Sequence, residues 1–151
     1  MSPRACTLAF LAACAFGAAA TRPEAAESAG RRLDITANVR QVAGGGATLR
    51  QHGSFAGSPL GKGTVTLRTT IGAGAGATFS FELVNARGSV HGAGNVALEF
   101  KDATIIYSGT AKITDGAGAF RNVRARDLHV SGSGPLSGET FKVRLTGTAR
   151  T

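Results

Sequence analysis

The sequence contains no tryptophan, one tyrosine and two cysteines. Both cysteines, Cys6 and Cys14, lie within residues 1–20, so the rest of the chain has neither a disulfide nor thiol chemistry. The lack of tryptophan argues against an immunoglobulin-type core, which packs around a buried tryptophan. No helical period of apolar residues follows residue 20. A domain made from these residues therefore depends on packing and on sheet hydrogen bonds.

Acidic residues are few, and the formal net charge is +8, but the two signs alternate along the chain. The densest basic cluster is Arg121, Arg124 and Arg126, which Asp127 interrupts. A nucleic-acid interface needs a basic stripe with stacking aromatic residues or a recognition helix, and neither is found. We therefore expect no nucleic-acid partner. The charges are typical of a solvated strand surface, with attraction to anionic cell-surface polymers as the alternative.

Residues 1–20 have the pattern of a signal peptide. Arg4 provides a positive start, Ala5 to Ala15 is apolar apart from Thr7, and Ala18-Ala19-Ala20 resembles a cleavage site. The apolar stretch is shorter than the ~20 residues that cross a bilayer, so no membrane span is expected. The pattern predicts a secreted or periplasmic protein. One alternative is a lipobox ending at Cys14, which would carry a lipid anchor; another is a buried alanine-rich helix.

Residues 21–32 are polar and are predicted to form a flexible tether ahead of a single domain at residues 33–151. Within that domain, apolar and polar residues alternate in short runs that glycine-rich turns separate. In the clearest run, Phe79, Phe81 and Leu83 lie on one face of a strand, and Ser80 and Glu82 on the other. The expected strands lie near residues 33–40, 47–55, 64–68, 79–83, 90–100, 104–113, 128–130 and 141–146, with a loop at 131–138.

Strands joined by hairpin-length loops predict an all-β antiparallel meander. Eight of them can close into an up-and-down barrel, whose interior is filled by side chains or holds one small ligand. Gly92, Gly94 and Gly109 interrupt the strands and indicate the kinks that a small closed barrel needs. A two-sheet β-sandwich is the alternative.

One segment has a distinctive order of glycines and an aromatic residue. Residues 114–125 resemble the strand–turn–strand pattern Thr-Gly-Gly-Ser-Gly-x-Phe-x-x-Val/Ala-x-Gly of the allene oxide cyclase and dirigent families. The matching residues are Thr114, Gly116, Gly118, Phe120 and Val123. The resemblance implies an eight-stranded antiparallel barrel in which the glycines permit the turn and the phenylalanine closes one end of the barrel.

Three positions depart from that pattern: Asp115, Ala117 and Ala125. Aspartate tolerates a left-handed backbone better than most residues, so we expect Asp115 to replace a glycine with little cost. The matching residues are structural in these families, so the resemblance implies no catalytic residue here. Beyond the fold, it suggests only an apolar ligand.

The candidate ligand-pocket residues are large side chains near the expected barrel interior, namely Phe79, Phe81, Leu98, Phe100, Tyr107 and Phe141. Tyr107 is the expected polar contact; alternatively, it packs across strands with its hydroxyl in water. An isomerase or stereo-directing protein acting on a lipid-like or phenolic substrate would need Tyr107 and an acid such as Glu99 or Asp127 as proton handlers. Alternation places Glu99 outward, which counts against it.

Other catalytic and metal chemistry has little support in the sequence. His52, His91 and His129 lie far apart, and none has a second ligand at metal spacing. Ser89 and Ser131 each lie two residues from a histidine, but no nucleophile elbow surrounds them. We therefore expect no metal, no cofactor and no catalytic triad. The sequence favours a non-catalytic exported barrel that binds a small apolar ligand or an envelope component, with a filled barrel acting through its surface as another class.

Overall fold

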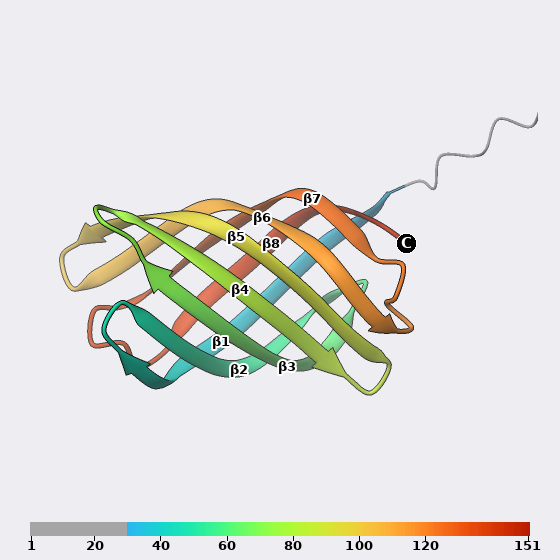
Figure 1. Cartoon of the computed structure of the whole chain (residues 1–151), viewed down its shortest axis with the longest axis horizontal. Helices are drawn as coiled ribbons and strands as arrows, with labels where there is room; N and C mark the ends of the chain where they lie inside the picture. The colour runs from blue at the N-terminus through green and yellow to red at the C-terminus, as the bar shows by residue number, and fades with distance from the viewer. Residues whose placement is uncertain (1–29) are drawn as a thin grey trace, which may run out of the picture.

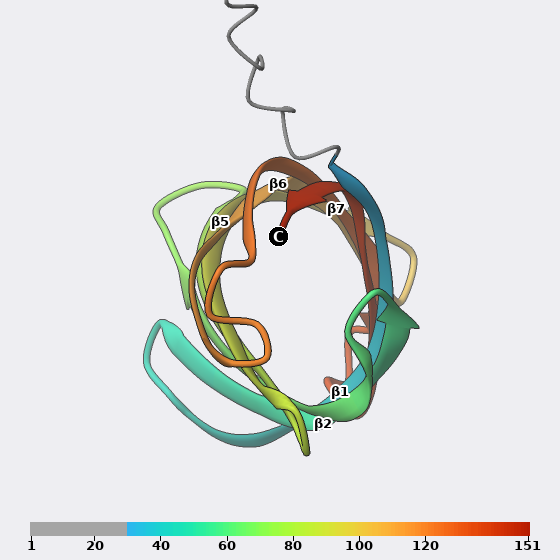
Figure 2. The same ribbon diagram turned by 90° about the vertical axis from the view of Figure 1, so that its right-hand side faces the viewer.

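The computed structural model describes residues 30–151, which form a closed antiparallel barrel (Figures 1 and 2). Its strands are β1 (Arg31–Gly45), β2 (Thr48–Ser58), β3 (Gly61–Ile71), β4 (Gly76–Asn85), β5 (Gly88–Lys101), β6 (Thr104–Gly118), β7 (Arg124–Pro135) and β8 (Phe141–Arg150). Each strand pairs with the next, and β8 returns to pair with β1, so the described sheet has no free edge. The predicted up-and-down barrel is confirmed, and the sandwich is excluded.

The predicted leader and most of the predicted tether, at residues 1–29, lie outside the described residues. The strand β1 begins at Arg31, two residues before the expected start of the domain. Arg31 and Arg32 pair with Ala149 and Thr148 of β8, which explains why these polar residues join the sheet. Within residues 30–151, no helix is long and apolar enough to cross a membrane.

The loop expected at residues 131–138 is wrong in its first half, because β7 continues as far as Pro135. In isolation, Ser131-Gly132-Ser133-Gly134 has the composition of a loop. In the barrel, Gly132 and Gly134 lie opposite Tyr107 and Ile105 of β6. A small residue leaves room for the bulky side chain opposite it, so β6 and β7 remain paired at these glycines and the strand continues.

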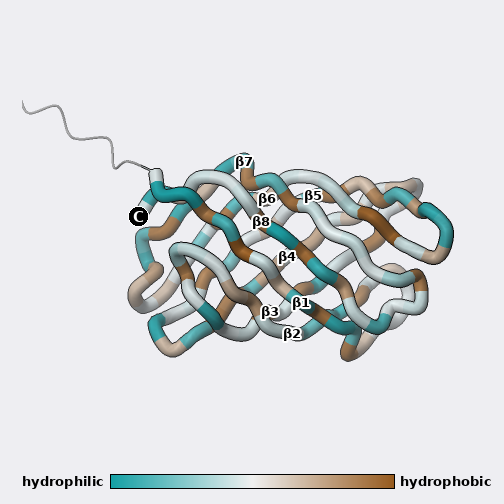
Figure 3. The backbone as a smooth tube through the Cα atoms, turned by 180° about the vertical axis from the view of Figure 1, so that it is seen from behind, coloured by the Kyte–Doolittle hydropathy of each residue, from teal (hydrophilic) through white to brown (hydrophobic). Residues whose placement is uncertain are grey.

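Hydrophilic and hydrophobic residues follow one another closely along the strands (Figure 3), and the buried hydrophobic ones form the core inside the ring. On β1, Leu33, Ile35 and Val39 are almost fully buried, whereas Arg40 on the same strand is exposed. Buried residues from all eight strands join one continuous core cluster. Since apolar side chains line the inside of the ring, their burial is the main contribution to its stability.

The turn between β6 and β7 folds inward over one end of the ring (Figure 2). Gly118 has a φ of 64°, a left-handed backbone that glycine adopts without strain. Phe120 is 5% exposed and joins the core cluster with Val123. The Arg87 guanidinium lies 5.2 Å from the centre of the Phe120 ring, at cation–π distance. This end of the barrel is therefore closed.

Asp115, which we expect to replace a glycine at little cost, does not have a left-handed backbone. Among residues 30–151, the non-glycine residues with positive φ are Asp102, at 53°, and Asp127, at 55°. Asp115 stays within β6, where its Oδ1 accepts a hydrogen bond from the Gly116 N–H at 2.8 Å. The local hydrogen bond is compatible with an extended strand, so position 115 needs no glycine.

An ion pair on the outer surface joins β1 to β8, where the barrel closes. The Nε and Nη2 atoms of Arg144 donate to the two carboxylate oxygens of Asp34, at 3.0 and 2.8 Å. Hydrogen bonding to Arg144 lowers the pKa of Asp34 below its ordinary value. The bidentate contact is compatible with the register of β1 against β8, in which Asp34 lies opposite Thr146 and Arg144 opposite Thr36.

Candidate ligand cavity

A cavity of about 310 Å³ lies inside the other end of the barrel. Its lining residues come from β2 through β8 and from Leu136 in the β7–β8 loop. Volumes of about 300 Å³ and above are typical of small-molecule sites in proteins. Twelve of the fifteen lining residues have hydrocarbon side chains; the other three are Gln51, Thr69 and Tyr107. The cavity therefore matches a small, mainly apolar molecule.

Most of the pocket residues predicted from the sequence meet in this cavity. Five of the six line it, namely Phe79, Leu98, Phe100, Tyr107 and Phe141. Phe81 is not among the lining residues; it belongs to the core, with its ring centroid 6.1 Å from that of Phe79.

Phe100 lies at the mouth of the cavity rather than in the interior, and it is 60% exposed. It stands one residue before the end of β5, next to the two-residue turn at Asp102 and Ala103, where little of the barrel covers it. Ile71 and Leu136 are also exposed large apolar residues that line the cavity. The mouth therefore has an apolar rim.

The aromatic rings around the cavity lie against glycines on the neighbouring strands. Tyr107 pairs with Gly132, and Phe79 pairs with Gly94. A Cβ atom built at Gly134 would overlap the Phe141 ring, because that ring covers the glycine. Glycine lets each ring lie flat on the wall of the barrel. Flat rings leave the middle of this end open.

Gln51 is the buried polar residue of the cavity, and it is not among the pocket residues predicted from the sequence. It is 7% exposed, and its Oε1 accepts a long hydrogen bond of 3.5 Å from Thr69 Oγ1. No other side-chain hydrogen bond within residues 30–151 engages it. Every fully enclosed side-chain N or O atom in this part of the chain has a partner. The Gln51 amide nitrogen therefore borders the open space of the cavity.

The signal for Gln51 was present in the alternation of β2. Leu49 and Phe55 face the interior, and Gln51 falls in the same phase between them. A polar residue at an inward position is uncommon, because burying an unpaired amide costs about 1–3 kcal/mol. Such a residue indicates a ligand contact or an internal hydrogen bond.

Tyr107 lines the cavity with its ring, but its hydroxyl already has a partner. The hydroxyl donates to the Lys142 backbone carbonyl of β8 at 3.1 Å. The ring packs beside Phe141, with centroids 6.3 Å apart. Burial raises the pKa of Tyr107 well above its ordinary value of 10.0. The sequence offered two expectations for this hydroxyl, a contact with the ligand or exposure to water. Neither describes it fully, since it contacts the backbone.

The raised pKa of Tyr107 predicts how the barrel responds to alkali. We expect the native protein to keep its phenol protonated at pH values where the unfolded chain, with a pKa near 10.0, has already ionised. The unfolded state then binds fewer protons, so the free energy of unfolding decreases as the pH rises above about 10. Phenolate absorbance measures the ionisation of Tyr107 directly, because the chain has one tyrosine and no tryptophan. Ionisation near pH 10 with an unchanged circular-dichroism spectrum would contradict the burial of this ring.

The acids considered as proton handlers lie outside the cavity. Glu99 and Asp127 are exposed, and neither is among the cavity's lining residues. The lining, as far as residues 30–151 describe it, contains no carboxylate, histidine, lysine, arginine or cysteine. The polar groups of the cavity lining are therefore one phenol, one amide and the Thr69 hydroxyl, and none of them is a strong proton acceptor.

The three histidines lie apart on the barrel. His91 Nε2 lies 3.5 Å from Ser89 Oγ and 3.7 Å from Glu82 Oε1. A serine–histidine–acid relay needs a different ring nitrogen for each partner, and here both contacts fall on Nε2. His52 contacts Thr66 Oγ1 at 3.3 Å. No group of three or more histidine, cysteine, aspartate or glutamate side chains within residues 30–151 is arranged to hold a metal ion.

No protein-family model matches the chain, and no curated protein or solved structure matches it. The class of protein rests on the fold and the cavity alone: a closed eight-stranded barrel with one plugged end and one hollow, apolar end.

Proposed function

We propose that the protein is an exported, non-catalytic barrel that binds one small apolar ligand. The observation that carries this proposal is the cavity of about 310 Å³, whose fifteen lining residues include twelve hydrocarbon side chains and the buried amide of Gln51. Removing apolar surface from water is worth about 25 cal/mol per Å², so such a lining favours hydrophobic ligands. The apolar rim at the mouth gives such a ligand a path into the barrel.

Export is part of the same proposal and rests on the leader at residues 1–20. A protein that leaves the cytoplasm carries its ligand through an aqueous compartment, where a water-insoluble molecule needs a binding protein. A lipid on Cys14 is the alternative; it would hold the barrel at a membrane surface.

Catalysis of the allene oxide cyclase or dirigent type is the second candidate. The matching segment at residues 114–125 supports it through the fold. The composition of the cavity supports binding instead, because general acid–base catalysis needs titratable groups within hydrogen-bond reach of the substrate. Among the described lining residues, Tyr107 is the single titratable group, and its hydroxyl donates to Lys142.

Gln51 is the proposed polar contact of the ligand, and two fluorescent probes of similar shape, a naphthol and naphthalene, can test it. We expect Gln51→Leu to weaken the binding of a naphthol about fivefold and to leave naphthalene binding unchanged. A hydrogen bond made in a buried site is worth about 1 kcal/mol, which equals that factor. The matched control is Tyr107→Phe, which removes a hydroxyl that the backbone already engages. Fluorescence titration of the three proteins measures both affinities.

The outcomes separate the role of Gln51 from the function itself. If neither dye binds the wild-type protein with one-to-one stoichiometry, the proposal of an apolar binding protein fails. If both dyes bind and Gln51→Leu changes neither affinity, only the assignment of the polar contact is wrong.

A further inference from the structure

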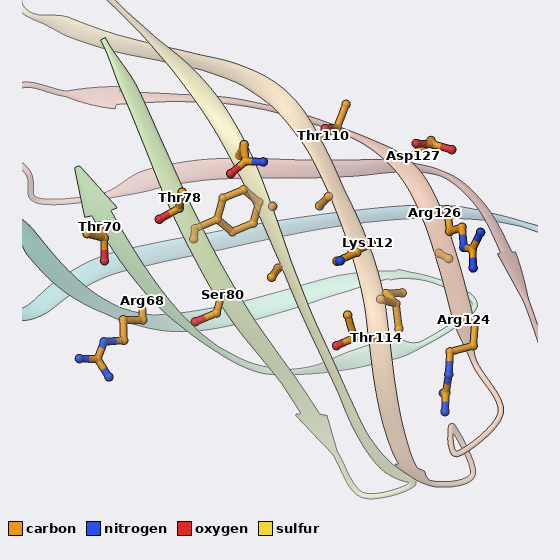
Figure 4. A pocket seen from close by; sticks show the side chains of 17 residues that line it. Arg68, Thr70, Thr78, Ser80, Thr110, Lys112, Thr114, Arg124, Arg126 and Asp127 are labelled. Atoms are coloured by element: carbon orange, nitrogen blue, oxygen red, sulfur yellow. The ribbon is translucent and has the colours of Figure 1, made fainter. Parts of the chain in front are cut away.

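A second hollow lies on the outer wall of the barrel, and it shares one lining residue, Phe79, with the cavity. It has a volume of about 990 Å³ and extends across β3, β4, β5, β6 and β7 (Figure 4). Among its lining residues, Arg68, Thr78, Asn95 and Lys112 are exposed, in the outward phase of their strands. We call this hollow the outer trough.

Small polar side chains form the middle of the outer trough. Thr78 of β4 pairs with Asn95 of β5, and Asn95 pairs with Thr110 of β6. Ser80 lies beside this row on β4 (Figure 4). The row presents hydroxyl and amide groups on three adjacent strands, and each group can donate and accept hydrogen bonds.

Cationic side chains stand at both sides of this row. Arg68 of β3 lies at one side, and Lys112 of β6 and Arg126 of β7 lie at the other (Figure 4). Within residues 30–151, no side-chain hydrogen bond or ion pair engages any of these three cations. Arg124 also lines the trough, but it donates to the Val123 and Arg121 carbonyls at 2.8 and 3.1 Å.

A break in the pairing of β7 with β8 lies next to the residues of β7 that line the outer trough. The register of β7 shifts between Ala125 and His129 against β8, and Asp127 has a φ of 55° there. Irregularities of this kind, which are common at the rims of barrels, change the direction of side chains. Arg126 and Asp127 are both exposed and both line the trough, so an acceptor accompanies the cations.

We propose that the outer trough binds a segment of an acidic polysaccharide. The unpaired cations match carboxylate groups on the sugars, and the central row of hydroxyl and amide groups matches sugar hydroxyls. A single-stranded nucleic acid fits less well, because it needs exposed aromatic rings for stacking. The one aromatic residue of the lining, Phe79, is 8% exposed and faces the core. Apart from Phe79, the trough and the apolar cavity have no lining residue in common, and this proposal does not rest on the ligand of the cavity.

The test is calorimetric titration with a short oligogalacturonate. We expect binding that weakens as salt rises from about 50 mM to about 200 mM, because counterions are released on binding. Lys112→Gln and Arg126→Gln should each reduce affinity about fivefold, the upper range for an exposed ion pair. The matched controls are Lys62→Gln and Arg40→Gln, which remove the same charges from exposed positions outside the trough. Their affinities should remain within a factor of about two of wild type.

Two further comparisons make the result specific to sugars. Asn95→Ala removes an amide without changing the charge, and it should weaken oligogalacturonate binding at both salt concentrations. A polyglutamate peptide and a single-stranded oligonucleotide of equal charge should bind more weakly than the oligogalacturonate. The proposal is overturned if the control lysine and arginine matter as much as those of the trough. It is also overturned if Asn95→Ala has no effect, or if either competing polyanion binds as tightly.

Discussion

Replacement of Leu98 by tryptophan should abolish binding of apolar ligands while the barrel stays folded. Leu98 lines the cavity and pairs across the strands with Tyr107, so an indole at this position would take up much of the space. We expect at least about a tenfold loss of affinity for naphthalene, equal to about 1.4 kcal/mol. The same titration of dye fluorescence measures it.

The variant reports on its own side chain, because the natural sequence has no tryptophan. Indole emission should be blue-shifted if the ring occupies the cavity. The matched control is Ala97→Trp, whose side chain is exposed on the outer wall; it should emit as in water and bind normally. Unchanged dye affinity for Leu98→Trp with a blue-shifted indole would show that the dye binds somewhere else.

Adding a single methyl group at Gly134 should destabilise the barrel by about 2–3 kcal/mol. The three atoms nearest to a Cβ at this position all belong to the Phe141 ring, which the surrounding wall holds in place. Overpacking of this kind in a core typically costs about 1–3 kcal/mol. Denaturant unfolding of Gly134→Ala, followed by circular dichroism, measures the loss.

A double-mutant cycle identifies the cause. In a Phe141→Leu background the ring is gone, so Gly134→Ala should cost less than about 1 kcal/mol. Gly45→Ala is the control, because a Cβ at Gly45 meets no atom within 4 Å and the variant should be near neutral. If Gly134→Ala lowers the free energy of unfolding equally in both backgrounds, contact with the Phe141 ring is not the reason why position 134 requires glycine.

The barrel could be predicted from the sequence because burial of apolar side chains is its main stabilising force, and the buried side chains recur at every second residue of a strand. Phe79, Phe81 and Leu83 are all buried, as their alternation indicates. Glycine was harder to interpret. Gly132 and Gly134 have the composition of a loop, and they continue β7 only because bulky residues of β6 and β8 cover them. That information lies outside the segment itself.

The cavity was predictable in part, for the same reason. Alternation identified six large residues expected near the barrel interior, and five of them line the cavity, although it did not indicate at which end of the barrel they meet. Which of them leave space and which fill it depends on ring orientation, as the deeper position of Phe81 shows. The outer trough could not be predicted, since it combines residues of five strands whose register only the closed sheet defines.

Native mass spectrometry of the protein purified from its own host tests the binding function most directly. We expect the mass of the wild-type protein to exceed that of the bare chain by the mass of one apolar small molecule. Organic solvent should release this molecule, and the Leu98→Trp variant should not carry it. A bare mass for the wild-type protein, together with no uptake of naphthalene, would contradict an open cavity that serves as a binding site.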